Sequence, residues 1–239
     1  TPLSATAADY DLDGLVDVYI CSYVFWRGGS NSAGTRLPIP YHEAHNGAAN
    51  ILLKNLGGGR FKNMTAESGL GRNNQRFSFA AAWGDYDDDG HPDLYIANDF
   101  GSNNLWRNRG DGTFEETTAT AGVEDTGAGM SVSWEDYDND GDLDLYVGNM
   151  FSAAGQRVTG KEDYKAGDRQ LQGIYRRHAR GNSLFSNSGG GAFADRSLVG
   201  SSWFGRWAWG SDFLDFNLDG HEDIYVQNGF LTNSREHDL

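Results

Sequence analysis

The sequence predicts an all-β fold built from repeated four-stranded antiparallel sheets. Three observations carry this prediction: an acidic loop motif that occurs four times, an alternating apolar segment after each copy, and a recurring glycine-rich turn. The composition agrees, because 33 of the 239 residues are glycine and only 4 are proline. That balance is typical of many tight turns and not of a flexible linker.

The acidic motif has the form D-x-[DN]-x-D-G-x-x-D. It reads DYDLDGLVD from Asp9, DYDDDGHPD from Asp85, DYDNDGDLD from Asp136 and DFNLDGHED from Asp215. The pattern positions hold 15 aspartates, and the other 19 acidic residues equal the 19 lysines and arginines in number. The formal net charge of −15 is therefore concentrated in these loops.

Carboxylates two residues apart repel one another unless a cation lies among them. Oxygen ligands at positions 1, 3 and 5 suit Ca²⁺, whereas Mg²⁺ requires a stricter octahedron and retains water. Glycine at position 6 permits the sharp turn, position 7 is expected to offer its backbone carbonyl, and the aspartate at position 9 closes the site. About four Ca²⁺ ions are expected, and four solvated acidic turns are the alternative. Asn217 leaves the fourth loop one carboxylate fewer, so that loop is expected to bind most weakly. The expected metal ligands are Asp9, Asp11, Asp13, Leu15, Asp17, Asp85, Asp87, Asp89, His91, Asp93, Asp136, Asp138, Asp140, Asp142, Asp144, Asp215, Asn217, Asp219, His221 and Asp223.

Strands are expected on both sides of each loop. An EF-hand opens similarly but needs a glutamate at position 12 and flanking helices. Position 12 is instead Ile20, Ile96, Val147 or Val226, within alternating segments such as VDVYI and DLYIA. Such alternation indicates β-strand.

A second element recurs between the loops. It reads NILLKNLGGGRF from Asn50, NNLWRNRGDGTF from Asn103 and NSLFSNSGGGAF from Asn182, which is typical of a strand, a glycine turn and another strand. Four antiparallel strands repeated at about 50 residues predict one β-propeller blade per repeat. We expect a single propeller segment over 1–239, with repeats at about 1–75, 76–126, 127–204 and a partial fourth at 205–239, or about three and a half blades.

Two long inserts separate strands 2 and 3 in the first and third repeats, 23 and 28 residues longer than in the second. Strand 2 runs away from the acidic loop, so both inserts should emerge as loops on the opposite face and flank a cleft over the second repeat. The insert between Phe151 and Arg180 is basic, and arginine suits carboxylates or sulfates. The alternative is that both inserts only cap the fold. The expected ligand-binding residues are Trp26, Arg27, Tyr41, His42, His45, Tyr164, Tyr175, Arg176, Arg177 and His178.

The repeats resemble the FG-GAP or VCBS family of calcium-binding propeller blades, as in the integrin α-subunit head. The joined motifs D-Y-D-x-D-G-x-x-D-L-Y-V and N-x-L-φ-x-N-x-G-x-G-x-F are most similar to bacterial and animal proteins related to cartilage acidic protein. This resemblance implies a secreted, cell-surface or periplasmic protein, usually with seven blades, that binds protein partners or carbohydrate and is seldom an enzyme. Since only about three and a half blades are visible, further blades or a partner chain are expected to complete the ring.

Composition excludes several other classes. The negative charge argues against nucleic acid, and no apolar run approaches the length of a membrane span. The single cysteine, Cys21, excludes an internal disulfide. The sequence therefore favours a calcium-stabilised extracellular binding or assembly module, for example in cell adhesion or carbohydrate binding. The alternative is a calcium-dependent propeller enzyme such as a polysaccharide lyase, for which no catalytic residue is assigned.

Overall fold

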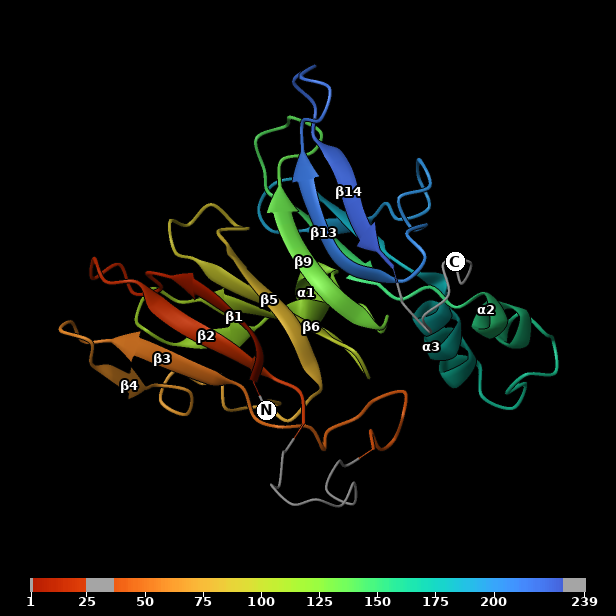
Figure 1. Cartoon of the computed structure of the whole chain (residues 1–239), viewed down its shortest axis with the longest axis horizontal. Coiled ribbons are helices and arrows are strands. Elements are labelled where there is room, and N and C mark those ends of the chain that lie inside the picture. Colours follow the sequence, from red (N-terminus) through yellow and green to blue (C-terminus); the bar gives the residue numbers. More distant parts are fainter. Residues whose placement is uncertain (1, 25–36, 230–239) are drawn as a thin grey trace.

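A computed structural model describes residues 2–24 and 37–229 of the chain. Successive antiparallel sheets follow one another along it (Figure 1). The first sheet consists of β1 (Pro2–Ala8), β2 (Asp17–Ser22), β3 (Ile51–Asn55) and β4 (Phe61–Asn63). The second consists of β5 (Ser78–Gly84), β6 (Asp93–Asn98), β7 (Asn104–Asn108) and β8 (Phe114–Glu116). The third consists of β9 (Gly129–Glu135), β10 (Asp144–Asn149), β11 (Ser183–Asn187) and β12 (Phe193–Asp195). A two-stranded sheet follows, of β13 (Ala208–Leu214) and β14 (Asp223–Asn228).

Strands adjacent in sequence are also adjacent in each sheet. The prediction of an all-β fold with four-stranded antiparallel sheets is therefore confirmed, while the closed ring, the number of blades and the repeat boundaries stay predictions. The register places each acidic loop at a hairpin tip, because Ala8 pairs with Asp17 and Gly84 pairs with Asp93. Glu135 pairs with Asp144 and Leu214 with Asp223 in the same way.

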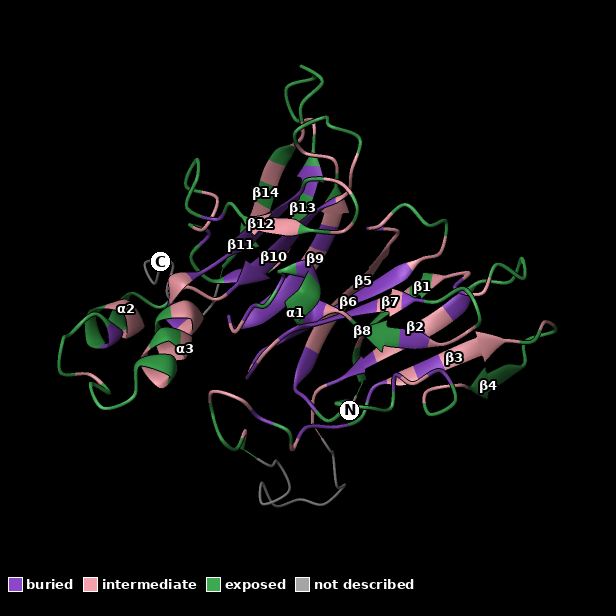
Figure 2. Cartoon of the chain, turned by 180° about the vertical axis from the view of Figure 1, so that it is seen from behind, coloured by how far each residue is buried: buried purple, intermediate pink, exposed green. Residues whose placement is uncertain are grey.

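The hydrophobic core lies between successive sheets. Successive side chains of a strand point to opposite faces, so Leu94 and Ile96 of β6 pack toward the first sheet, against Tyr19. Tyr95 packs toward the third sheet, in a cluster with Leu145. All six residues of β6 and of β10 are buried, as Figure 2 shows for these middle strands.

The second and third sheets are each held to the sheet before them by an asparagine at the glycine turn. The side-chain amide of Asn108 donates a hydrogen bond to the carbonyl of Tyr10 (2.7 Å), in the first acidic loop. Asn187 donates in the same way to Tyr86 (2.8 Å), in the second loop. The Asn108 side-chain oxygen meanwhile accepts the N–H of Gly110 (3.0 Å), whose φ of +72° favours glycine. The asparagine side chain therefore both donates to the preceding loop and accepts from the glycine, which explains why asparagine and glycine recur two residues apart.

The second insert is helical, which corrects the expectation of an elaborated loop. It contains α2 (Ala153–Thr159) and α3 (Arg169–Arg180). Side chains cap both helices: Ser152 accepts the N–H of Gly155, and Asp168 accepts the N–H of Leu171. Arg177, His178 and Arg180 lie in the last turn of α3, where positive charge complements the helix dipole.

A third helix, α1 (Thr118–Ala121), is a single turn. None of the helices in the described ranges combines the length and apolar character that crossing a bilayer requires.

Candidate functional site

The four acidic loops share one backbone conformation. The residue at position 4 and the glycine at position 6 both have positive φ in every copy: Leu12 and Gly14, Asp88 and Gly90, Asn139 and Gly141, and Leu218 and Gly220. The aspartate at position 1 accepts the backbone N–H groups of positions 5 and 6, at 2.8 to 3.1 Å in all four loops. The motif thus encodes a turn that holds its first carboxylate in place.

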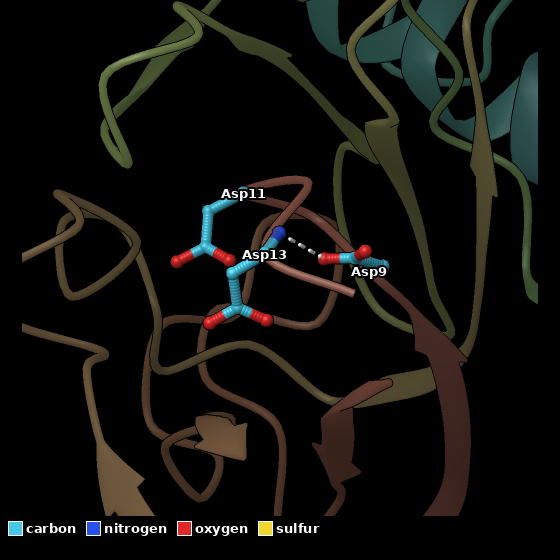
Figure 3. Close-up of side chains that lie close together, drawn as sticks. All are labelled: Asp9, Asp11 and Asp13. Carbon is cyan, nitrogen blue, oxygen red and sulfur yellow. Dashed lines mark hydrogen bonds between the residues drawn. The ribbon is translucent and has the colours of Figure 1, made fainter. Parts of the chain in front are cut away.

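Three of the loops gather carboxylates at one point. Oxygen atoms of three aspartates lie within 4.8 Å of one another in each, and Figure 3 shows the first such cluster. The clusters are Asp9, Asp11 and Asp13; Asp85, Asp87 and Asp93; and Asp136, Asp138 and Asp144. A donor set of oxygens alone fits a hard cation such as Ca²⁺. Asp89 and Asp140 occupy position 5 of the second and third loops.

The fourth loop differs. Its Asp215 and Asp219 keep the common turn, but the side-chain oxygen of Asn217 accepts the N–H of Asp219 (2.9 Å). Asp223 is exposed, and within the described residues no third strand joins β13 and β14. In the part of the chain that the structure describes, this loop forms no cluster of three acidic ligands.

The aspartate at position 9 is buried in the first three loops. Asp17, Asp93 and Asp144 each accept a backbone N–H from loop position 2 (3.1 to 3.3 Å) and another from the last asparagine of the third strand (2.7 to 2.8 Å). Burial raises the pKa of Asp93 to about 8 and that of Asp144 to about 7. Burial also raises the pKa of Asp17. A nearby cation offsets this penalty on the charged form.

The residues at position 7 help to close the turn. The backbone N–H groups of Leu15, His91, Asp142 and His221 donate to the carboxylate at position 5, at 2.9 to 3.0 Å. Their expected role as carbonyl ligands stays a prediction.

Two basic side chains that contact the loop carboxylates could not be recognised from the sequence motif. Lys54 Nζ contacts the carboxylate of Asp11 and lies 3.0 Å from Asp13 Oδ2. These hydrogen bonds hold the pKa of Lys54 above its usual value and that of Asp13 below.

In the second repeat, Arg107 occupies the same position. Its Nε lies 2.6 Å from Asp87 Oδ2, and its Nη2 lies 3.0 Å from Asp89 Oδ2. The signal available in the sequence was the fifth position of the N-x-L-φ-x-N element, which reads Lys, Arg and Ser in the three copies.

On the other face of the molecule, the two inserts touch each other. The ring of Tyr41 lies nearly parallel to that of Tyr175, with centroids 6.5 Å apart, and its hydroxyl lies 3.3 Å from His178 Nε2. His42 and Tyr164 also contact Tyr175, at 5.7 and 5.9 Å between ring centroids. In Figure 1 this region, with α2 and α3, lies away from the tips of the β1–β2 and β13–β14 hairpins. The two inserts, expected as separate walls, are thus in contact with each other.

The other expected ligand-binding residues lie apart from this contact. His45 is half exposed beside Glu43, 3.4 Å away. Arg176 donates its Nε–H to the carbonyl of Thr159 (2.9 Å). Arg177 forms an ion pair with buried Asp125 (2.9 Å). Trp26 and Arg27 lie outside the described residues.

Part of the chain is similar in sequence to a known family of repeats. Residues 85–147, which include the second and third acidic loops, match the FG-GAP-like repeat family. This match confirms the family resemblance seen in the motifs.

The resemblance to proteins related to cartilage acidic protein is also borne out. A stretch of 58 residues is 43% identical to cartilage acidic protein 1 of Homo sapiens and 41% identical to that of Mus musculus. The protein of the same name from Xenopus tropicalis is 38% identical. Each match covers 24% of this chain and 9% of the relative. The similarity is therefore to a small part of each relative.

Proposed function

We propose that this chain is a calcium-binding repeat module of an extracellular protein, with the metal in the acidic loops and a binding face at the inserts. The observation that carries this proposal is the recurrence of one turn that gathers carboxylates. In each of three loops, oxygen atoms of three aspartates lie within 4.8 Å of one another, at positions 1, 3 and 5 in the first loop and at positions 1, 3 and 9 in the second and third. A buried aspartate at position 9 ties each turn to the third strand.

The proposed ligands are the aspartates at positions 1, 3, 5 and 9, with the carbonyl at position 7. Bound Ca²⁺ would supply positive charge where the chain concentrates its negative charge. Four ions would change the formal net charge from −15 to −7. The chain's own hydrogen bonds do the positioning, because backbone N–H groups donate to the carboxylates at positions 1 and 9.

We propose an extracellular, cell-surface or periplasmic location on the same grounds. Extracellular calcium modules typically bind with dissociation constants of about 10⁻⁴ to 10⁻³ M. Loops of that affinity would fill only where calcium is abundant. The FG-GAP-like match supports the same location and a binding or adhesion role. Further blades or a partner chain remain our proposal for what completes the fold.

Neither the family match nor the named relatives support the alternative of a polysaccharide lyase. The insert face is instead proposed to bind a protein partner or a glycan, because loops and helices on a rigid scaffold are where binding residues concentrate.

Isothermal titration calorimetry with Ca²⁺ and with Mg²⁺ tests the metal proposal. We expect Ca²⁺ binding in the range above and weaker Mg²⁺ binding. Asp85→Ala should remove one site, because it deletes the carboxylate that holds the second loop. The matched control is Asp111→Ala, an exposed aspartate on the glycine turn. Absence of Ca²⁺ binding to the wild-type chain, or an equal effect of both variants, contradicts the proposal.

A further inference from the structure

A pocket of about 490 Å³ lies where the two inserts meet, a size typical of small-molecule sites. It is bordered by Tyr41 of the first insert, by Asp99 and Phe100 after β6, and by Tyr164 and Tyr175 of the second insert. Phe151 and Trp207 add further aromatic surface, and Met150 and Val158 add aliphatic surface. The walls are therefore mainly aromatic and apolar.

Asp99 provides the negative charge of this pocket. Its side chain is 7% exposed, and one carboxylate oxygen accepts a hydrogen bond from the hydroxyl of Tyr23. Burial raises the pKa of Asp99 to about 6, which leaves it ionised at pH 7.4. A buried carboxylate beside aromatic rings costs free energy unless a positive group approaches it.

The residues that line the pocket, within the described chain, include no lysine or arginine. Two arginines of α3 pair with carboxylates: Arg177 with Asp125, and Arg180 with Asp195, whose Oδ2 lies 3.2 Å away. Arg176 does not line the pocket and donates its Nε–H to the backbone carbonyl of Thr159, which does (2.9 Å). His178 does line the pocket, but burial lowers its pKa, so the imidazole is neutral at pH 7.4. The described residues thus make the pocket anionic and aromatic, which does not suit the carboxylates or sulfates expected from the basic insert.

We infer that this pocket binds an organic cation, specifically an alkylated ammonium group, with Asp99 as the counter-charge and the aromatic rings as the cage. Aromatic faces attract such cations, and the attraction is strongest where water is excluded. A metal ion fits less well, because the walls offer few oxygen ligands. The inference deepens the proposed binding role of the insert face, on which it rests.

Calorimetry on the Ca²⁺-loaded chain, with choline and with 3,3-dimethyl-1-butanol, tests the inference. The alcohol has the same shape as choline but carries no charge. We expect choline to bind at least about tenfold more tightly, because Asp99 and the aromatic faces attract a charge that the alcohol lacks. Acetate and glucose are the further probes, and neither should bind. Asp99→Asn should reduce the preference of choline over the alcohol, because it removes the counter-charge, whereas Glu162→Gln, which removes a charge from the exposed α2–α3 connection, should preserve it.

If Asp99→Asn does not fold, Tyr175→Leu provides a second variant, and it should weaken choline binding while leaving acetate and glucose without effect. Equal binding of choline and the alcohol, or preferential binding of acetate or glucose, overturns the inference.

Repeating the choline titration in EGTA separates the two proposals. Choline binding without any calcium effect on thermal stability keeps the pocket and overturns the metal role. A calcium effect on thermal stability without choline binding keeps the metal role and overturns the pocket. If choline binds, phosphocholine vesicles and a trimethyl-lysine peptide then distinguish a lipid from a protein source of the cation.

Discussion

The second and third acidic loops have the same backbone, but the neighbouring strand presents a different side chain to each. Arg107 lies against Asp87 and Asp89 in the second repeat, at 2.6 and 3.0 Å. In the third repeat the corresponding residue is Ser186, whose hydroxyl lies 3.5 Å from Asp138 Oδ2. One loop thus has an internal cation, and the other has a weak neutral contact. The first loop resembles the second, with Lys54 in place of the arginine.

This difference changes the expected order of calcium affinity. At the ligand positions, the first and second loops each carry four carboxylates, and one basic partner brings the sum of these charges to −3. The third carries four carboxylates with no lysine or arginine against them in the described residues, and the fourth carries three. Since affinity rises with ligand charge, the third loop should bind most tightly. Counting carboxylates alone predicts three equal sites and one weaker site.

Calcium removal should produce the largest effect. Each site occupied at one hundred times its dissociation constant adds about 2.7 kcal/mol to the free energy of unfolding. A chain of this size gains about 2–4 °C in melting temperature per kcal/mol. We therefore expect EGTA to lower the melting temperature by at least about 10 °C, measured by circular dichroism. Superimposable melting curves with Ca²⁺ and with EGTA would show that calcium does not stabilise the chain, and the comparison of calcium affinity among the loops would then be wrong.

Exchanging the two strand residues should reverse the order of the second and third loops. Arg107→Ser should tighten calcium binding in the second loop, and Ser186→Arg should weaken it in the third. Each change should be about fivefold, which corresponds to about 1 kcal/mol for a partly exposed ion pair. The amide signals of Gly90 and Gly141, followed by NMR during titration, report the two loops separately. Arg109→Ser, which removes an arginine that pairs with Glu115, is the control and should change neither signal's midpoint.

Single charge deletions should have opposite effects in the absence of calcium. Asp138→Asn relieves repulsion within the third loop and should raise the melting temperature in EGTA. Asp87→Asn breaks the ion pair with Arg107 and should lower it. Both shifts should be about 1–4 °C, as expected for up to 1 kcal/mol in a chain of this size. Shifts of the same sign would mean that Arg107 does not stabilise the second loop.

Restoring the missing carboxylate of the fourth loop should have the smallest effect. Asn217→Asp should tighten calcium binding there by about threefold, within the range of one exposed charge interaction. The Gly220 amide reports this loop, and Asn228→Asp, outside the loop on the same hairpin, provides the control. An unchanged midpoint for Gly220 would show that charge count does not set the order of the sites.

The acidic loops and the strands around them could be predicted from the sequence, because the motif specifies its own local hydrogen bonds. Gly90 and the carboxylate of Asp85 form the turn within five residues of each other. The position of Arg107 could not be predicted in the same way. Whether a side chain of β7 faces the loop depends on the register of β7 against β6, which is set across the sheet.

The helices of the second insert were missed for a different reason. The basic composition of that segment is compatible with a solvated loop as well as with a helix. The caps at Ser152 and Asp168 favour helix, but these signals are short and local. Asp99 could not be predicted as a pocket residue from the sequence. It becomes one because it is buried against Tyr23 and because the third repeat brings aromatic side chains next to it.

The asparagine link between sheets gives the array a direction. Asn108 of the second sheet holds the carbonyl of Tyr10 inside the first acidic loop, and Asn187 of the third sheet holds Tyr86 inside the second. The second and third sheets therefore each hold the backbone of the acidic loop that precedes them. Under tension applied from the C-terminal end, undocking of the third sheet would break its link to the second loop while the link between the second sheet and the first loop stays intact. A pulled chain would therefore lose these links one repeat at a time, starting from its C-terminal side.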